Sequence, residues 1–257
     1  MTNRGGYLTI PLKKMNNRIK KIQGNRLEIT HCAEILSSAF MTDPFYNFVF
    51  PDAERRARLL PWLSRKLLAY AARYGVIFTD ANFQGVSIWL GPNHTDLLPL
   101  GIFQTGLFVF PFKVSRLEFK RSTTLAQVSN HLHKQVISTP HYYLQVVGVE
   151  PSQQGKGLGR ALVQAGLSRA DELKVPCYLE TYNSDNLCFY GSLGFKVMGS
   201  EKASLHAPSA WGLLREPKEF ESSSAACNYC LLYTSDAADD LLCVDLGGRR
   251  IIKKKTN

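Results

Sequence analysis

The stretch that decides the fold of this chain is Gln153-Gln154-Gly155-Lys156-Gly157-Leu158-Gly159-Arg160. It lies between an apolar, β-rich run (143–149) and a run typical of a helix (161–173). Glycines in such a turn let the backbone approach a ligand closely. The unpaired amides at the start of the following helix point at an anion, and the helix dipole favours negative charge there. The stretch therefore predicts a site for a phosphate-bearing ligand at residues 154–160.

The spacing of the glycines selects among phosphate ligands. A Walker loop is excluded because Gly157 is followed by Leu158 rather than by lysine. A dinucleotide fingerprint lacks its third glycine, since position 160 is arginine. Glu180 stands about 20 residues further on, where such a site needs an acid, so this alternative stays open. The order Gln154-x-x-Gly157-x-Gly159 resembles the pyrophosphate-binding turn of the GCN5-related N-acetyltransferase (GNAT) family.

A second motif strengthens this resemblance. Asn186-x-x-Phe189-Tyr190, followed by Gly194-Phe195, is similar to a second hallmark of the same family, in the right order and at the right distance. The match is most similar to the puromycin N-acetyltransferase-like branch. It covers residues 141–217 and extends less specifically back to about Leu27.

The resemblance implies an α/β fold with a mixed, mainly antiparallel central sheet that is flanked by helices and splayed at the cofactor site. It implies acetyl-CoA as cosubstrate and no metal. The residues expected to bind the cofactor are Val147, Gly148, Val149, Gln154, Gly155, Lys156, Gly157, Leu158, Gly159, Arg160 and Asn186. Asn186 either hydrogen-bonds the pantetheine arm or stabilises its own turn, and we favour the first role.

Two residues are predicted to be catalytic. The resemblance places Tyr190 beside the sulfur of the cofactor as general acid; the alternative is a core aromatic residue. Glu180, at the end of a predicted strand, is expected to take the proton of the amine; the alternative is a surface carboxylate. Direct attack on the thioester in a ternary complex needs no nucleophilic cysteine. Weaker candidates for the acceptor pocket are Asp43, Tyr46, Trp62 and Trp89.

Composition and charge set the organisation of the chain. Its 257 residues, 45% of them hydrophobic, are enough to bury one sizeable core. The net charge is +10, but residues 1–26 hold seven cations and no acid, and residues 27–227 carry only +2. We therefore expect no nucleic-acid partner. The predicted parts are a basic, disordered tail (1–25), one domain (26–218) and a further tail (219–257). From about residue 228 the sequence resembles translated sequencing-adaptor read-through, and we expect that part not to belong to the natural protein.

The remaining patterns bear on location and metals. Six scattered cysteines fit a reducing compartment, and we expect a cytoplasmic protein. Cys227-x-x-Cys230 lacks a second ligand pair, and His131-x-His133 lacks a third ligand, so no metal is expected. Residues 97–114 are apolar but are interrupted by proline and glycine. They predict a buried, irregular element beside the substrate pocket rather than a membrane span.

Local patterns predict the elements of the core. We expect a strand at 26–30, a helix capped by Thr30, an aromatic element at 45–50 and a helix at 54–74 that Pro61 kinks. A hairpin is predicted at 75–80 and 85–90, a helix at 122–135, and strands at 175–181, 196–198 and 210–214. Ser184 or Asp185 is expected to cap a short helix that ends at Gly194.

Together these patterns predict an acyltransferase, acting on the primary amine of a small molecule. The alternatives are a peptide or protein N-acetyltransferase and a non-catalytic CoA-binding regulatory module. We expect no membrane partner and a monomer or homodimer.

Overall fold

The computed structural model describes residues 19–92, 94, 95 and 98–218. The strands are β1 (Ile19–Ile22), β2 (Gly75–Asp80), β3 (Gly85–Leu90), β4 (Tyr142–Val149), β5 (Cys177–Thr181), β6 (Lys196–Lys202) and β7 (Ser209–Arg215). The helices are α2 (Arg26–Ala39), α3 (Pro44–Val49), α4 (Ala53–Tyr74), α5 (Pro99–Thr105), α6 (Phe110–Lys113), α7 (Arg116–Val136), α8 (Leu158–Glu172) and α9 (Asn186–Gly191), with 3-10 turns η1 (Leu107–Val109) and η2 (Pro151–Gln153).

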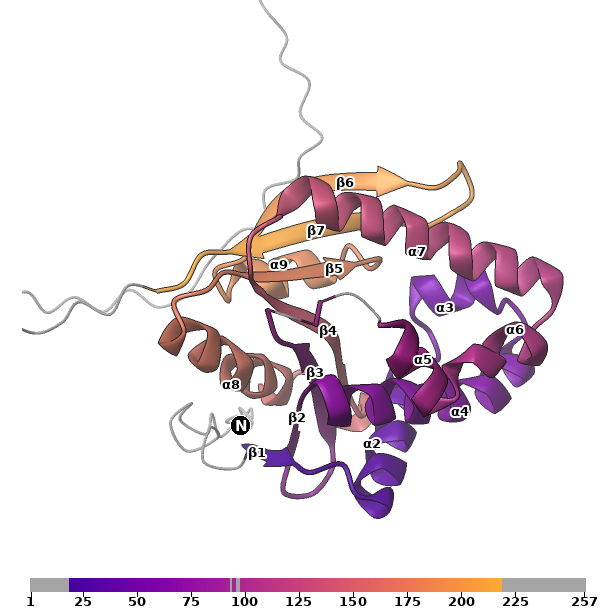
Figure 1. Ribbon diagram of the computed structural model, residues 1–257, viewed down its shortest axis with the longest axis horizontal. Coiled ribbons are helices and arrows are strands. Elements are labelled where there is room, and N and C mark those ends of the chain that lie inside the picture. Colours follow the sequence, from indigo (N-terminus) through magenta and orange to yellow (C-terminus); the bar gives the residue numbers. More distant parts are fainter. Residues whose placement is uncertain (1–18, 93, 96–97, 219–257) are drawn as a thin grey trace, which may run out of the picture. The chain divides into compact units, whose positions relative to one another are not determined.

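The strands form one seven-stranded sheet in the order β1-β2-β3-β4-β5-β7-β6 (Figure 1). All neighbours are antiparallel except β4 and β5, which run parallel. The expected class, a mixed and mainly antiparallel sheet flanked by helices, is confirmed.

The sheet splits open between its two parallel strands. Strands β4 and β5 pair only at Tyr142 with Cys177 and at Tyr143 with Tyr178. Strand β4 continues to Val149, and β5 to Thr181, without further pairing between them. The predicted splay is therefore present, and it leaves unpaired backbone groups on both strands where a ligand can be inserted.

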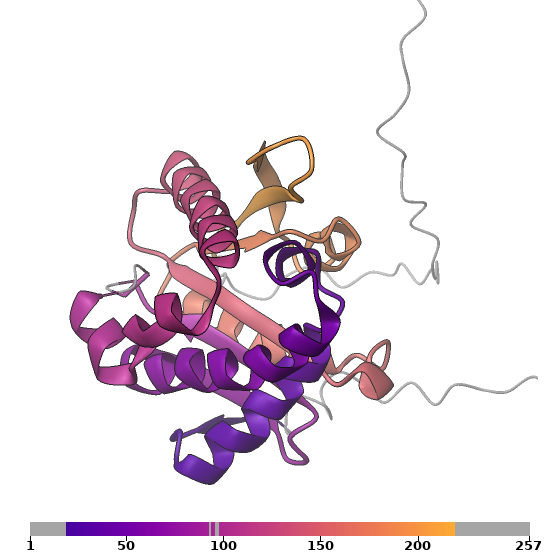
Figure 2. The ribbon, with the colours of Figure 1, turned by 90° about the vertical axis from the view of Figure 1, so that its right-hand side faces the viewer.

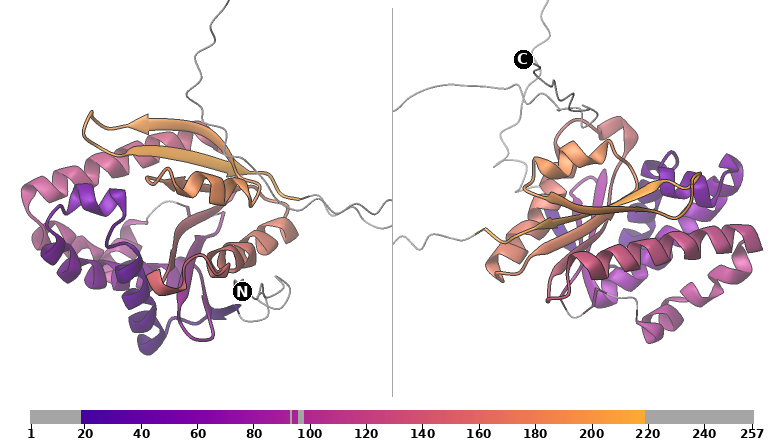
Figure 3. Two further views of the ribbon diagram at one scale, coloured as in Figure 1. Left: turned by 180° about the vertical axis from the view of Figure 1, so that it is seen from behind. Right: turned by 90° about the horizontal axis from the view of Figure 1, so that it is seen from above.

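Helices cover both faces of the sheet (Figures 2 and 3). Helices α2 and α4 pack on strands β2 to β4, and α7 packs on β5 to β7; α8 packs on β1 to β4 from the opposite face. A buried ion pair joins α8 to β7, because both guanidinium nitrogens of Arg215 donate to the carboxylate of Asp171, at 2.8 and 2.9 Å.

A β-bulge in β4 sets which side chains face the split. Ile88 pairs with Val146 and Trp89 with Leu144, so Gln145 is the extra residue. A bulge of this kind changes the alternation of side chains along the strand. Beyond it Gly148 faces α2: a Cβ atom at Gly148 would lie 2.9 Å from Leu36.

The start of the domain differs from the prediction. Residues 26–30 form the first turns of α2, not a strand, and Asn25 rather than Thr30 caps that helix. Asn25 accepts from the Glu28 amide at 3.0 Å, and Glu28 accepts in return from the Asn25 amide at 3.2 Å. This capping box outweighs the short alternation. Strand β1 lies inside the predicted tail 1–25 and pairs with β2. The predictions for residues 1–18 and 219–257 lie outside the described residues.

Residues 97–114 also differ from the prediction. The described part forms α5, η1 and α6, and several of its large apolar side chains are exposed rather than buried. No helix in the described part of the chain is both long and apolar enough to cross a membrane. Helix α4 runs through Pro61, in agreement with the helix predicted at 54–74. Helix α7 begins at Arg116 rather than at the predicted residue 122, because Ser115 caps it.

Candidate active site

The glycine-rich turn builds an anion site at the start of α8. After β4 ends, Gly155 and Gly157 take left-handed conformations, with φ of 73° and 81°. Side chains other than glycine rarely adopt this region. Gly157 is the N-cap of α8 and offers no side chain to its first amides, which are left for a ligand. The Gln154 side chain holds the turn in place by donating to the Val149 carbonyl oxygen at 3.0 Å.

A cavity of about 490 Å³ lies in the split of the sheet, against this turn. Ten of the predicted residues line it: Val147, Gly148, Val149, Gln154, Gly155, Gly157, Gly159, Arg160, Asn186 and Tyr190. The cavity thus runs from the unpaired part of β4 to the start of α8. We call it the cofactor cavity.

Two predicted cofactor residues do not line this cavity. The Lys156 ammonium group donates to the Ser152 carbonyl oxygen at 2.9 Å and to Gln153 at 3.1 Å, which turns it back onto the loop. Leu158 approaches Gly85 in β3. Arg160 lines the cavity while its guanidinium group donates to Ser192 Oγ at 2.6 Å.

A second cavity, of about 240 Å³, adjoins the first. We call it the acceptor cavity, and it shares five lining residues with the cofactor cavity: Phe40, Asp43, Val147, Asn186 and Tyr190. Aromatic rings form much of its wall: Phe45 and Tyr46 of α3, Tyr143 of β4 and Tyr182 just after β5. Its lining contains two carboxylates, Asp43 and Glu180, and no lysine or arginine. The wall therefore suits an apolar molecule with a cationic end.

Glu180 lines the acceptor cavity close to the end of β5. Burial raises the pKa of its carboxyl group to about 7, and the neighbouring side chains of Tyr143 and Tyr178 oppose this rise. A carboxylate with a pKa near neutrality can both accept and release a proton under physiological conditions. The prediction that Glu180 faces the acceptor is consistent with this position.

Tyr190 lies at the junction of the two cavities. Its ring packs edge-on against Phe189 and Phe195, with centroids 5.1 and 5.9 Å apart. Burial and the charge of Asp43 raise the pKa of Tyr190 above its ordinary value. The hydroxyl group is therefore protonated at neutral pH and available as a donor.

Asp43 and Gln145 are the residues that sequence reasoning missed or underrated. Asp43 caps α3 and accepts from the Phe45 amide at 2.9 Å, and burial raises its pKa. The sequence named Asp43 only as a weak candidate for the acceptor pocket. Gln145 Oε1 is buried with no hydrogen-bond partner among the described residues. Only the bulge reveals it, and no sequence pattern marked that bulge.

Of the other weak candidates, Tyr46 lines the acceptor cavity, whereas Trp89 is buried in the core and Trp62 lines neither cavity. Among the described residues no group of three or more histidines, cysteines or acids could hold a metal ion. His131 pairs with Glu201, and His133 Nε2 lies 2.7 Å from His141 Nε2.

The cysteines of the described core are not placed for nucleophilic attack. Cys32 and Cys177 are buried, and burial raises the pKa of both thiols to about 12. Cys188 lines neither the cofactor cavity nor the acceptor cavity.

Comparison with known families agrees with this geometry. A family model described as an acetyltransferase (GNAT) domain matches residues 125–197, which include the glycine-rich turn, Glu180 and Tyr190. Residues 125–197 thus match a GNAT acetyltransferase domain. The chain is an acyltransferase.

Two curated relatives carry the same activity class. An uncharacterized N-acetyltransferase of Schizosaccharomyces pombe is 28% identical over 169 residues, which are 63% of this chain and 68% of the relative. A mycothiol acetyltransferase of Kocuria rhizophila is 45% identical over 53 residues, 20% of this chain and 18% of that protein.

Two solved structures share the GNAT fold. One is described as histone acetyltransferase HPA2 and related acetyltransferase from Corynebacterium glutamicum, with a TM-score of 0.54 and 21% sequence identity. The match covers 79% of this chain and 97% of the Corynebacterium glutamicum chain. Arylalkylamine N-acetyltransferase 2 from Aedes aegypti has a TM-score of 0.54 and 14% sequence identity. The match covers 78% of this chain and 99% of the Aedes aegypti chain.

Gly159→Glu tests the cofactor cavity. Gly159 lines the cavity on the first turn of α8, and a Cβ atom there makes only ordinary contacts, the nearest 3.6 Å from Val149. We expect the added carboxylate to repel pyrophosphate and to weaken CoA binding on the order of 100-fold, since a like-charge contact costs several kcal/mol. Calorimetric titration with CoA measures the effect.

The matched control is Gly159→Ala, which adds the Cβ atom without charge and should keep most of the affinity. Both variants should melt close to the wild-type temperature. Equal CoA affinity in the glutamate variant and the wild type would contradict the placement of the cofactor.

Proposed function

We propose that the chain transfers the acetyl group of acetyl-CoA to the primary amine of a small molecule, by direct attack in a ternary complex. The observation that carries the proposal is the junction of the two cavities at Tyr190, with the glycine-rich turn on one side and Glu180 on the other. A thioester held in the split and an amine held in the acceptor cavity would meet there. Holding both reactants together removes much of the entropic barrier.

The cofactor cavity fits acetyl-CoA on the chain's own features. Unpaired amides at the start of α8 suit the pyrophosphate, and the backbone of Val147 to Val149, unpaired toward β5, suits the amides of a pantetheine arm. Acetyl-CoA would supply the activated acyl group. Asn186 lines both cavities and is placed to orient the two substrates.

The acceptor cavity favours a small amine with an apolar or aromatic body. Its volume of about 240 Å³ is small, and α3 and α7 contribute to its wall. Tyr182 donates to the Leu125 carbonyl oxygen at 2.7 Å, and the Phe45 ring packs against Tyr182 at 5.2 Å. Gln145 Oε1 supplies an unused acceptor for the N–H groups of the amine. These features favour a small molecule over a peptide chain.

In the proposed reaction Glu180 accepts a proton from the ammonium group, so that the amine nitrogen can attack the thioester carbonyl carbon. A C–N bond forms and the C–S bond breaks, and the positively charged nitrogen loses its second proton to solvent. The Tyr190 hydroxyl group donates its proton to the departing sulfur, and solvent returns a proton to Tyr190. Glu180 releases its proton to water, which its pKa of about 7 permits.

A non-catalytic CoA-binding module and a nicotinamide-binding protein are the competing functions. Neither requires a carboxylate with a pKa near 7 facing an aromatic cavity next to the cofactor. The test is acetyl-CoA consumption, measured as thiol release, with a panel of aminonucleosides, polyamines, arylalkylamines and short peptides. We expect turnover with a small apolar amine. Turnover with peptides alone would overturn the acceptor class, and CoA binding without turnover of any amine would favour the binding module.

Glu180→Gln tests the base. With a pKa of about 7, kcat/KM of the wild type should rise about tenfold per pH unit below pH 7 and level off above it, because only the carboxylate accepts a proton. In the variant we expect a rate loss of roughly 10²-fold at pH 7 and no inflection near pH 7. The rate should recover in part at high pH, where the amine deprotonates unaided. A loss of equal size at every pH would assign Glu180 to positioning.

Tyr190→Phe tests the acid. The substitution removes one oxygen and keeps the ring that packs against Phe189 and Phe195. We expect turnover to fall roughly 10²–10⁴-fold while CoA affinity changes little. Turnover and thermal midpoint are measured on one preparation, with Phe195→Leu as the control for ring packing, because Phe195 packs against Tyr190 and lines neither cavity. Normal turnover in Tyr190→Phe would remove this hydroxyl group from the reaction.

A further inference from the structure

The exposed apolar side chains of the domain are concentrated in one segment. Six of the eleven large hydrophobic residues that are exposed in the described part of the chain lie within twenty residues of one another. We call them the phenylalanine-rich surface: Leu100, Phe103, Phe108, Phe112, Leu117 and Phe119. Phe112 is 86% exposed and Phe103 67%. Apolar surface gathered in this way marks an interaction site, whereas single exposed apolar residues need no explanation.

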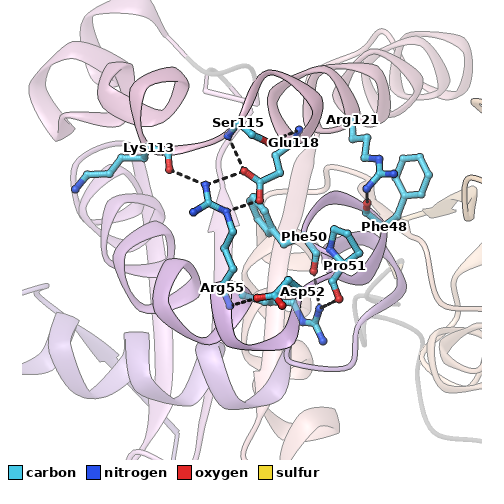
Figure 4. Close-up of polar contacts among 10 residues, drawn as sticks. Phe48, Phe50, Pro51, Asp52, Arg55, Lys113, Ser115, Glu118 and Arg121 are labelled. Carbon is cyan, nitrogen blue, oxygen red and sulfur yellow. Dashed lines mark hydrogen bonds and ion pairs between the residues drawn. The ribbon is translucent and has the colours of Figure 1, made fainter.

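The segment that carries this surface is held firmly from its inner side. Helix α5 and turn η1 pack on α4 (Figure 1). Arg55 of α4 donates to the Lys113 carbonyl oxygen at 3.2 Å and to Glu118 Oε2 at 2.8 Å (Figure 4). The Phe103 and Phe108 rings stack on each other, with centroids 5.3 Å apart. The exposed phenyl rings are therefore carried by a segment that is fixed to α4.

The charges on this segment have one sign. Lys113, Arg116 and Lys120 are exposed, and in Figure 4 the Lys113 side chain points away from the polar contacts around Arg55. The acid of this segment, Glu118, is buried and bound by Arg55 and by the Ser115 amide. Exposed phenyl rings beside exposed cations favour a partner that is apolar and anionic at once.

Polar uncharged groups of the segment are already used inside the chain. Gln104 accepts from the Tyr74 hydroxyl group at 3.1 Å, and Thr105 donates to the Gly101 carbonyl oxygen at 2.8 Å. A protein partner is normally recognised through hydrogen bonds as well as apolar contacts. A surface with rings and cations, but few free hydrogen-bonding groups, suits a partner without fixed hydrogen-bond geometry.

We propose that the phenylalanine-rich surface binds the interface of an anionic lipid bilayer. The phenyl rings would enter the boundary between headgroups and acyl chains, and Lys113, Arg116 and Lys120 would contact lipid phosphates. This is binding to one leaflet, not insertion across it, which agrees with the short helices of the segment. It revises the expectation that the chain has no membrane partner.

The test is flotation of the full chain with vesicles of phosphatidylcholine alone and with 30% phosphatidylserine. We expect binding to the anionic vesicles and little to the neutral ones. Phe103→Ser with Phe112→Ser should reduce the partition at least tenfold. Lys113→Gln and Arg116→Gln should each reduce it about fivefold, since one cation near an anionic surface contributes about that factor.

The matched control is Leu173→Ser, because Leu173 is 53% exposed at the end of α8, which packs on the opposite face of the sheet from α4. It should leave the partition unchanged. All variants should keep the wild-type thermal midpoint, because the altered side chains are exposed.

Two results would overturn the proposal. Undiminished vesicle binding by the double phenylalanine variant would assign the attraction to cations elsewhere, such as those of residues 1–26. The surface would be assigned to self-association if the wild-type chain does not bind anionic vesicles but forms a dimer, and if the double phenylalanine variant is monomeric. As an independent measurement, Phe112→Trp fluorescence should be quenched by brominated phosphatidylserine more strongly than wild-type fluorescence.

Discussion

The early end of pairing between β4 and β5 is the constraint on which the site depends. Two residue pairs join these strands, and beyond them backbone groups of both strands face the split. Unpaired backbone groups in a protein interior are costly unless a partner satisfies them. The glycine-rich turn, the start of α8 and the bulge at Gln145 are all arranged around this opening. The cofactor cavity is thus a consequence of how the sheet is divided.

The charged and polar groups that line the opening differ between its two sides. The cofactor side offers helix amides and Arg160, which favour an anion. The acceptor side offers Glu180, with Asp43 at the junction of the two cavities and no cation in its lining, which favours an ammonium group. Attraction of opposite charges to adjoining cavities would bring the substrates together in the orientation that transfer requires. Tyr190 is neutral at physiological pH, as tyrosine ordinarily is, and it lines both cavities.

The parts of the site that a short motif encodes were predictable from the sequence. The glycines at 155, 157 and 159 and the Asn186 to Tyr190 run identify the cofactor cavity, because a helix start and its ligand contacts are local. The bulge at Gln145, the inward position of Asp43 and the pairing of β4 with β5 arise from contacts between distant segments, and no local pattern signals them. The strand predicted at 26–30 was wrong because a local interaction outweighed a local pattern. The capping box of Asn25 and Glu28 starts a helix where the alternation of side chains indicated a strand. The Lys156 side chain bonds its own loop, which no local pattern signals, and the contact of Lys156 with the cofactor stays a prediction.

The division of the sheet also has a mechanical consequence. Strands β1 to β4 form one half and β5 to β7 the other, and only two rungs of the ladder connect them directly. A pantetheine arm that bonds the backbone of both strands would act as the missing rungs. Ligand binding would then stabilise the whole domain. A ligand that binds only the native fold raises the stability of the protein in proportion to the logarithm of the ligand concentration. The chain would resist unfolding most when its cosubstrate is abundant.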